Sequence, residues 1–232
     1  SPNAITYLCI LKACAITGDV EKGKQVHDEI VRKRLLGRNM SLGTALVAMY
    51  AKCGVLQKAE ELFDELSLRK VVSWNALIAG YTQQGQGEQA LYCFDCMQKE
   101  GLSPNSVTYI CVLKACASIG NVVRGEQVRE NMLKDGFLVT DIVIGTALLD
   151  MYAKCGALDK AKEVFNDLPA RNVISWNALI AGYALQGQSD EALQLFEQMQ
   201  KEKFPPDEVT YICALKACVC MGALDKGKKI HG

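Results

Sequence analysis

Glycines recur along this chain in a fixed cycle of intervals. The steps between them are 36, 31 and 35 residues, and the same three steps then follow again. Self-similarity at a period of roughly 20–50 residues is typical of arrays, because a unit of that length is too short to bury a core alone and stacks on its neighbours. The sequence therefore predicts an array rather than a globule. The glycines are Gly18, Gly54, Gly85, Gly120, Gly156, Gly187 and Gly222.

Whole phrases also return after every third step. VTYICVLKAC, which begins at Val107, becomes VTYICALKAC from Val209, and SWNALIAGY from Ser73 recurs from Ser175. The chain is thus one triplet of 102 residues written slightly more than twice.

The segment from Val71 to Asn105 illustrates one unit. Apolar residues fall at helical spacing up to Gly85, where a residue in the left-handed conformation can end a helix. A second apolar stripe runs over 88–100, before Gly101 and Pro104. Nothing in the segment alternates with period two. We therefore expect each repeat to be a pair of helices joined by a short turn, and the chain to be all-α with well over half of its residues helical.

Aromatic residues and cysteines hold fixed places in these repeats. An amphipathic helix needs an apolar stripe, so we interpret the aromatic residues as core rather than as platforms that stack on bases. The cysteines number 11, which is odd, and most of them recur at repeat positions. That pattern indicates small core residues in a reducing compartment. The aromatic residues are Tyr7, Trp74, Tyr109, Trp176 and Tyr211 in first helices, with Phe63, Phe94, Phe165 and Phe196 in second helices.

Charge and hydropathy exclude several classes of function. Lysine plus arginine equals aspartate plus glutamate at 26 each, so any nucleic-acid binding is local and not driven by an overall basic field. No apolar run approaches the ~18 residues of a membrane helix, and we expect no membrane partner. No basic, Ser-rich or hydrophobic leader precedes Pro2, and His231 stands where His27 stands in its own repeat, with the following residues missing. We therefore expect a soluble fragment of a longer protein, from which a C-terminal partner has been cut away.

Two motifs imitate a zinc deaminase, which needs His-x-Glu and Pro-Cys-x-x-Cys for its metal and its proton transfer. His27 with Glu29, and Cys93 with Cys96, match these spacings in part. No proline precedes Cys93, and the copies 102 residues later have lost the ligands. No Gly-rich phosphate loop and no nucleophile–base dyad stand out. We expect no enzyme activity, no metal and no cofactor in this chain.

The three repeat lengths distinguish between two families of helix pairs. Tetratricopeptide arrays keep one period of about 34 residues. The alternation here resembles the long, short and standard (L, S and P) motifs of the PLS subclass of pentatricopeptide repeat proteins, and LKAC, GTALVAMYAKCG and SWNALIAGY are similar to those motifs. The resemblance implies a right-handed superhelical solenoid of helix-turn-helix repeats. Its units are L 4–39, S 40–70, P 71–105, L 106–141, S 142–172, P 173–207 and a truncated L 208–232.

The resemblance also implies sequence-specific binding of single-stranded RNA in a plant mitochondrion or chloroplast, as the recognition tract of an RNA-processing or cytidine-to-uridine editing factor. In that family the fifth and last residues of a repeat read one base, and the second residue flanks it. The predicted base-reading pairs are Thr44 with Lys70, Asn75 with Asn105, Thr146 with Asn172, and Asn177 with Asp207. The predicted flanking residues are Ser41, Val72, Val143 and Ile174, and Lys52 and Lys154 are placed to reach phosphates. The alternative for these two lysines is an exposed side chain stabilised by the helix dipole.

The chemistry of the pairs predicts base preferences. Uracil and guanine present a ring N–H on the pairing edge, which suits an acceptor-only carboxylate, whereas cytosine and adenine present a bare ring nitrogen, which suits an amide donor. The family associates a fifth asparagine with pyrimidines and a fifth threonine with purines. We therefore expect C at repeat 71–105, A at 142–172, U at 173–207 and a purine at 40–70.

The L repeats depart from this pattern, because Leu8, Ile110 and Ile212 at their fifth places cannot hydrogen-bond a base edge. We expect them to act as spacers or to face partner proteins, such as those of an editing complex. A protein-binding scaffold is therefore the alternative function, since helical solenoids also bind proteins. Net neutrality favours the scaffold, and the recurring polar pairs of the P and S repeats favour RNA.

Overall fold

The structure is a computed structural model that describes residues 2–36, 39–137 and 141–222. Within these residues it contains thirteen α-helices and no β-strand, so the all-α prediction is confirmed. The helices are α1 (Ala4–Thr17), α2 (Val20–Arg32), α3 (Met40–Lys52), α4 (Leu56–Asp64), α5 (Val71–Gln83), α6 (Gly87–Lys99), α7 (Ser106–Ile119), α8 (Val122–Lys134), α9 (Ile142–Lys154), α10 (Leu158–Asp167), α11 (Val173–Leu185), α12 (Ser189–Lys201) and α13 (Glu208–Cys220).

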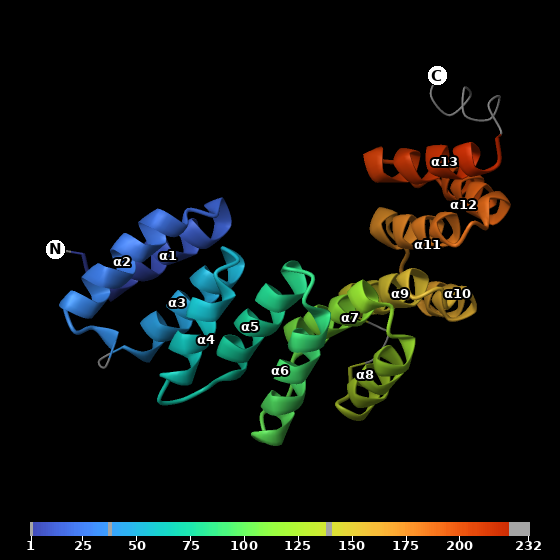
Figure 1. Cartoon of the computed structure of the whole chain (residues 1–232). Helices are drawn as coiled ribbons and strands as arrows, with labels where there is room; N and C mark the ends of the chain where they lie inside the picture. The colour runs from blue at the N-terminus through green and yellow to red at the C-terminus, as the bar shows by residue number, and fades with distance from the viewer. Residues whose placement is uncertain (1, 37–38, 138–140, 223–232) are drawn as a thin grey trace. The chain divides into compact units, whose positions relative to one another are not determined.

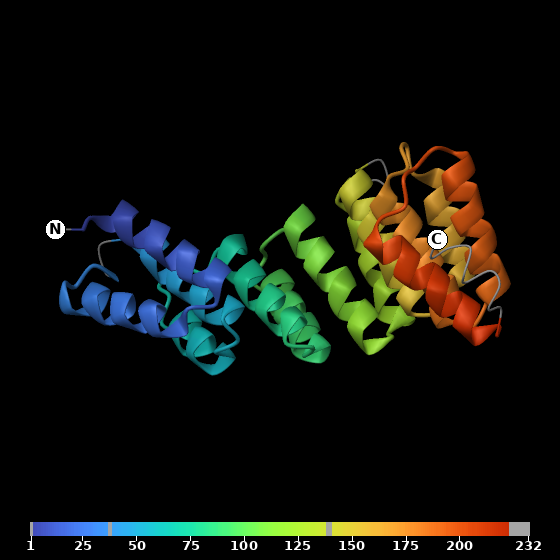
Figure 2. The same ribbon diagram turned by 90° about the horizontal axis from the view of Figure 1, so that it is seen from above.

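The helices alternate between two roles, which Figure 1 shows along the chain. The odd-numbered helices are the first helices of the repeats and stack on one another, α1 on α3 on α5 and, separately, α9 on α11 on α13. The even-numbered helices α2, α4, α10 and α12 each pack against the first helix of their own pair and against that of the next, as α4 does with α3 and α5. This is the packing of an all-α helical-repeat solenoid. Figure 2 gives a second view of the same pairs.

The chain forms two compact units, 1–115 and 116–232, so the boundary falls within α7. Each unit has its own stack of first helices. The final residues 223–232, which include His231 and most of the expected second helix of the last repeat, lie outside the described residues.

A glycine in the left-handed conformation closes the first helix of each pair. After α5, Gly85 has a φ of 72°, and the next residue, Gln86, donates its N–H to the carbonyl of Tyr81 at 2.9 Å. This bond satisfies a carbonyl that the helix end leaves unpaired. Other residues pay a steric penalty in this conformation, which is why the glycine spacing reports the repeat lengths.

The aromatic stripe is core, as expected. Trp74 and Trp176 are buried, and each meets a phenylalanine of the preceding second helix edge to face, with ring centroids 4.6 Å apart for Phe63–Trp74 and 4.7 Å for Phe165–Trp176. Tyr211 differs, since 39% of it is exposed. It lies on α13, and the residues expected to pair with that helix are outside the described part of the chain.

The cysteine prediction holds in part. Cys14, Cys116 and Cys218 are buried, but Cys9 is exposed. The thiols of Cys53 and Cys155 donate to the carbonyls of Cys14 and Cys116, at 3.6 and 3.7 Å, and so link the ends of successive first helices. No helix among the described residues combines the length and the apolar character needed to cross a membrane.

Candidate nucleic-acid interface

The last residue of each expected repeat is also the N-cap of the next first helix. Asn172 and Asp207, for instance, accept the backbone N–H three residues later through Oδ1, at 2.8 and 2.9 Å. Asn105 does the same with the N–H of Thr108 at 3.0 Å. These bonds satisfy N–H groups that a helix start leaves unpaired. Helix capping therefore holds the side chains of Asn105, Asn172 and Asp207, three of the residues predicted to read bases, against the start of the next first helix.

The two residues of the first predicted P-repeat pair are hydrogen-bonded to each other. Asn75 lies in the first turns of α5, and its Nδ2 donates to Oδ1 of Asn105 at 3.1 Å, although the two residues are 30 apart in sequence. A third residue completes the group, because the hydroxyl of Thr108 donates to Oδ1 of Asn75 at 2.7 Å. Oδ1 of Asn105 thus accepts from both Asn75 and the Thr108 backbone, and Nδ2 of Asn105 has no partner among the described residues.

The second P-repeat pair has the same construction. Asn177 Nδ2 donates to Asp207 Oδ1 at 2.8 Å, and the Thr210 hydroxyl donates to Asn177 Oδ1 at 2.5 Å. The hydrogen bond from the Thr210 backbone, and with it those from the Asn177 and Thr210 side chains, lowers the pKa of Asp207 below its usual value. Asp207 is therefore a carboxylate at neutral pH, with Oδ2 left over as an acceptor.

The two residues of each bonded pair differ in exposure. Asn75 and Asn177 are each only 8% exposed, and both ends of their amides are bonded to protein. Asn105 and Asp207 are exposed. The side-chain polar atom of each exposed residue that has no hydrogen bond within the described residues is thus a donor, Nδ2, in the first pair and an acceptor, Oδ2, in the second.

The S-repeat pairs are not brought together in this way. Thr44 and Thr146 donate their hydroxyls to carbonyls of their own helices, Met40 at 3.4 Å and Ile142 at 2.6 Å. Neither threonine contacts Lys70 or Asn172 through a hydrogen bond in the described part of the chain. A threonine hydroxyl in a helix can instead donate to the carbonyl one turn back, as both do here.

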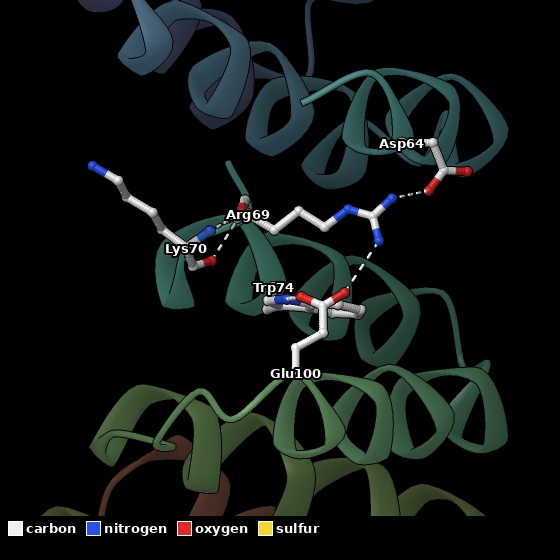
Figure 3. Close-up of polar contacts among 6 residues, drawn as sticks. Asp64, Arg69, Lys70, Trp74 and Glu100 are labelled. Carbon is white, nitrogen blue, oxygen red and sulfur yellow. Dashed lines mark hydrogen bonds and ion pairs between the residues drawn. The ribbon is translucent and has the colours of Figure 1, made fainter. Parts of the chain in front are cut away.

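Lys70 differs further, because lysine has no acceptor and cannot cap α5 with its side chain. The backbone of Lys70 still bonds to Ser73, whose hydroxyl accepts the Lys70 N–H at 3.0 Å. In Figure 3 the Lys70 side chain extends away from the neighbouring polar network. Of the eight predicted base-reading residues, four therefore form bonded pairs.

The predicted flanking residues are exposed. Val72, Val143 and Ile174 are 64%, 62% and 67% exposed, although they are apolar, and Ser41 is exposed as well. Apolar side chains at the same second place of the expected L repeats are also more than half exposed, which the sequence reasoning missed. Since this place recurs in every repeat, the repeat alignment alone could have found them. They are Ile5, Val107 and Val209.

The two predicted phosphate contacts have different surroundings. Lys52 and Lys154 are both exposed at the ends of α3 and α9. Lys154 Nζ lies 2.8 Å from Oδ2 of Asp150, one turn earlier, whereas Ala48 stands at that place before Lys52. Lys52 has no ion-pair partner among the described residues. The first lysine is therefore the freer cation.

Sequence reasoning also missed an ion-pair cluster beside Lys70, drawn in Figure 3. Arg69 bridges Asp64, at 2.9 Å, and Glu100, at 3.2 Å, and Trp74 Nε1 donates to the other oxygen of Glu100 at 3.2 Å. The guanidinium also lies 4.8 Å from the ring centroid of Phe63. This cluster ties the end of the expected repeat 40–70 to the end of the following second helix, α6, and its cation is already paired.

The residues that imitate a zinc site have other roles. His27 Nδ1 is 3.1 Å from the hydroxyl of Tyr50, and burial lowers the pKa of His27. Cys93 is buried, which raises the pKa of its thiol to about 12. A protonated core thiol is a poor metal ligand. No group of three or more candidate ligand residues gathers anywhere in 2–36, 39–137 or 141–222.

Comparison with protein families gives two matches. A model described as PPR repeat matches residues 5–35, 44–71, 107–137 and 146–173, and a model described as PPR repeat family matches 69–118 and 171–220. Each matched range covers all or part of a first helix together with the second helix that follows it, and the two longer ranges extend through most or all of the next first helix as well.

Curated relatives come from Arabidopsis thaliana and are pentatricopeptide repeat-containing proteins. One is 41% identical over 228 residues, covering 97% of this chain and 31% of the relative. Another, named mitochondrial, is 38% identical and covers 98% of this chain and 33% of the relative, and a third, named chloroplastic, is 39% identical and covers 99% and 31%. The chain thus spans about a third of the length of these relatives.

Among solved structures, the chain resembles the pentatricopeptide repeat protein PPR10 in complex with an 18-nucleotide psaJ RNA element. The TM-score is 0.81 at 20% identity, over 99% of this chain and 34% of that one. PPR10 from maize gives a TM-score of 0.59 at 22% identity, over 99% of this chain and 38% of that one. At such identities the likeness shows the fold.

Proposed function

This chain belongs to the pentatricopeptide repeat family, and we propose that it is a sequence-reading tract for single-stranded RNA. The observation that carries the proposal is the pair of bridged groups, Asn75 with Asn105 and Asn177 with Asp207, which present one exposed polar atom per P repeat. PPR10, whose fold this chain resembles, has been solved with an RNA element, which supports the same class of ligand.

The exposed atoms support opposite base preferences in the two P repeats. Nδ2 of Asn105 is a donor and suits the bare N3 of cytosine, and Oδ2 of Asp207 is an acceptor and suits the N3–H of uracil. The choice of a pyrimidine over a purine at both rests on the family's association with a fifth asparagine. We therefore assign C to repeat 71–105 and U to repeat 173–207.

The S repeats contribute less. Thr146 with Asn172 is assigned A and Thr44 with Lys70 a purine, but neither pair is bonded before RNA arrives. Ordering side chains on binding costs free energy, so bases at these repeats are discriminated more weakly than those at the P repeats. With RNA running 5′ to 3′ along the chain, the series is purine, C, any base, A, U.

We also assign the chain to the PLS subclass, as part of an organellar RNA-processing or editing factor. The alternating first-helix starts at 40, 71, 106, 142, 173 and 208 support the proposed L, S and P boundaries. Relatives named mitochondrial and chloroplastic support an organelle, without choosing between them. Any deaminase chemistry would lie elsewhere in the longer protein, and the chain itself is proposed to be a non-enzymatic adaptor.

The test is a fluorescence anisotropy titration with an RNA that carries 5′-ACNAU-3′ within a uniform flank. The control RNA has the C and U exchanged, so that composition and charge stay the same. We expect the first RNA to bind at least several-fold more tightly, with a salt slope of roughly −1.4 to −2 for two or three phosphate contacts. Equal binding of both RNAs, or none, would favour the protein-binding scaffold, for which the apolar Leu8, Ile110 and Ile212 are the supporting observation.

A further inference from the structure

Two buried threonine hydroxyls lie beneath the exposed atoms of the P repeats. Thr108 and Thr210 are the third residues of the L repeats that follow, and both are fully buried. Each hydroxyl touches both members of the preceding pair. Thr108 Oγ1 is 2.7 Å from Asn75 Oδ1 and 3.1 Å from Asn105 Oδ1, and it accepts the backbone N–H of Asn105 at 3.1 Å.

We infer that Thr108 is a positioning residue that sets the base preference of the preceding repeat, so that an L repeat without a reading pair of its own completes the site of its neighbour. This inference rests on the RNA-reading function proposed above. It assigns a role in specificity to a residue outside the fifth, last and second places.

The argument depends on which way two amides face. An asparagine side chain presents a donor on one side and an acceptor on the other, and its hydrogen-bond partners decide which side faces outward. The Thr108 hydroxyl donates to Asn75, so Oδ1 of Asn75 faces Thr108 and its Nδ2 faces Asn105. Asn105 must then turn Oδ1 inward and Nδ2 outward, toward the base.

Without the hydroxyl, this chain of constraints is broken. Asn75 could then turn its carbonyl toward Asn105. Asn105 could donate its Nδ2 to that carbonyl, which would leave its Oδ1 facing outward. An outward acceptor suits uracil rather than cytosine. The backbone N–H of Thr108 still favours the original orientation, so the expected effect is weaker discrimination and not a full reversal.

The second P repeat supplies a contrast. Thr210 makes the equivalent bond to Asn177, but its neighbour is Asp207, whose two oxygens are both acceptors. Turning the carboxylate leaves an acceptor facing outward in either case. Loss of the Thr210 hydroxyl should therefore leave the preference for uracil intact, even though the same bond is removed.

The S repeats lack this arrangement. At the third place of the following P repeats, the hydroxyls of Ser73 and Ser175 donate to the carbonyls of their own caps, Lys70 and Asn172, each at 2.8 Å. They make no bond to Thr44 or Thr146 in the described residues. The positioning role is thus a property of the boundary between a P and an L repeat.

The experiment compares four variants with the unaltered chain, using two RNAs that differ only at the base opposite repeat 71–105, which is C in one and U in the other. Thr108→Val removes the hydroxyl and keeps the shape, and Thr108→Ser keeps the hydroxyl. Thr6→Val removes the corresponding cap bond of α1, where Thr6 Oγ1 lies 3.0 Å from Asn3, and serves as the capping control. Thr210→Val is measured with C or U opposite repeat 173–207. Thermal melting by circular dichroism accompanies every titration.

We expect Thr108→Val to lower the C-to-U affinity ratio about fivefold, as one net hydrogen bond implies, and Thr108→Ser to retain it. Thr6→Val and Thr210→Val should change the ratios less than about twofold, whatever they do to the melting temperature. An unchanged ratio in Thr108→Val, or an equal fall in Thr210→Val, overturns the inference. If the unaltered chain shows no preference for C at this base, the proposed function itself fails, which is a separate outcome.

Discussion

Arg69 Nη1 lies 3.2 Å from Oε1 of Glu100, and the same pair recurs 102 residues later as Arg171 and Glu202, 3.1 Å apart. In both copies the guanidinium also lies 4.8 Å from the ring of a buried phenylalanine. The side chains are about one third exposed, which places these pairs between a surface ion pair and a buried one. Arg69 and Arg171 lie in the turns that lead into α5 and α11, so each ion pair ties such a turn to the end of the following second helix.

Replacing Arg69 with Met should therefore destabilise the chain by about 1 kcal/mol, from the lost ion pairs and the lost cation–π contact together. Urea denaturation measures this effect. The matched control is Lys24→Met, which removes an ion pair with the more exposed Glu21 and should change stability by less than about 0.5 kcal/mol. Similar losses in the two variants would show that the cluster stabilises no more than a surface pair.

Changing Asn105 to Asp replaces the exposed donor Nδ2 with an acceptor in nearly the same shape. The preference opposite repeat 71–105 should move from C toward U by about 1 kcal/mol, as one hydrogen bond is exchanged for a mismatch. Titrations with RNAs that differ only at that base measure it. The base opposite Asn177 and Asp207 is the internal control, and an equal change there, or no change at either base, would mean that Asn105 does not read a base.

The salt dependence of RNA binding should separate the two exposed lysines. Lys52→Ala should reduce the slope of log affinity against log salt by about 0.7, the value of one neutralised phosphate on a single strand. Lys154→Ala should reduce it less, because Asp150 already pairs with that lysine. Asp150→Ala should then steepen the slope. If all three variants kept the slope of the unaltered chain, both lysines would be excluded as phosphate contacts.

Val72 should matter for RNA and not for folding. Since its side chain is 64% exposed, Val72→Asn should change stability by less than about 0.5 kcal/mol, while removing an apolar contact with the face of a base. We expect weaker binding of every RNA, whatever its sequence. Val31, which is 51% exposed on the second helix α2, supplies the control variant Val31→Asn. Equal losses of affinity in the two variants would argue against a flanking role.

The pKa of Asp207 predicts a stability effect with a definite sign. Because the pKa is lowered in the folded chain, the stabilisation from the carboxylate is fully present above the pKa of an unfolded aspartate, about 3.9, and is lost as the pH falls through the lower folded value. The difference in unfolding free energy between the unaltered chain and Asp207→Asn should thus be constant near neutral pH and shrink in this acid range. A difference that stays constant down to acid pH would contradict the assigned hydrogen bonds.

Much of the fold follows from the sequence, because its signals are local. Helical periodicity and Gly85 mark both helices of the repeat 71–105 to within one or two residues of α5 and α6. The ion pair of Lys154 with Asp150 is also local, at a spacing of four within one helix, and could have been predicted.

The site was only partly accessible in this way. The pairing of Asn75 with Asn105 came from a family resemblance, since nothing in a spacing of 30 residues indicates a contact. Thr108 resembles an ordinary residue of a capping box, and its bond to Asn75 depends on how one first helix stacks on another. Thr44 and Thr146 donate to carbonyls of their own helices instead, and a paired sequence pattern does not report which of two available partners a hydroxyl takes.

The caps at the ends of the L repeats limit what a polar last residue means. Asn39 and Asp141 follow fifth residues that cannot read a base, yet their side chains cap α3 and α9 by accepting N–H groups at 3.1 and 2.8 Å. Starting a helix is sufficient reason for an asparagine or aspartate there.

The need to cap the next first helix also restricts which residue types can stand at the last place of the expected P repeats. Under the proposed function, a residue there begins a helix and also offers a group to RNA with the same few atoms. Only short side chains with an oxygen near the backbone do both. Helix capping and the proposed base recognition thus draw on the same small set of residue types. A new base preference at these positions therefore has to be engineered with residues that still cap the helix. Lys70 is not such a residue, and its side chain neither caps α5 nor pairs with Thr44.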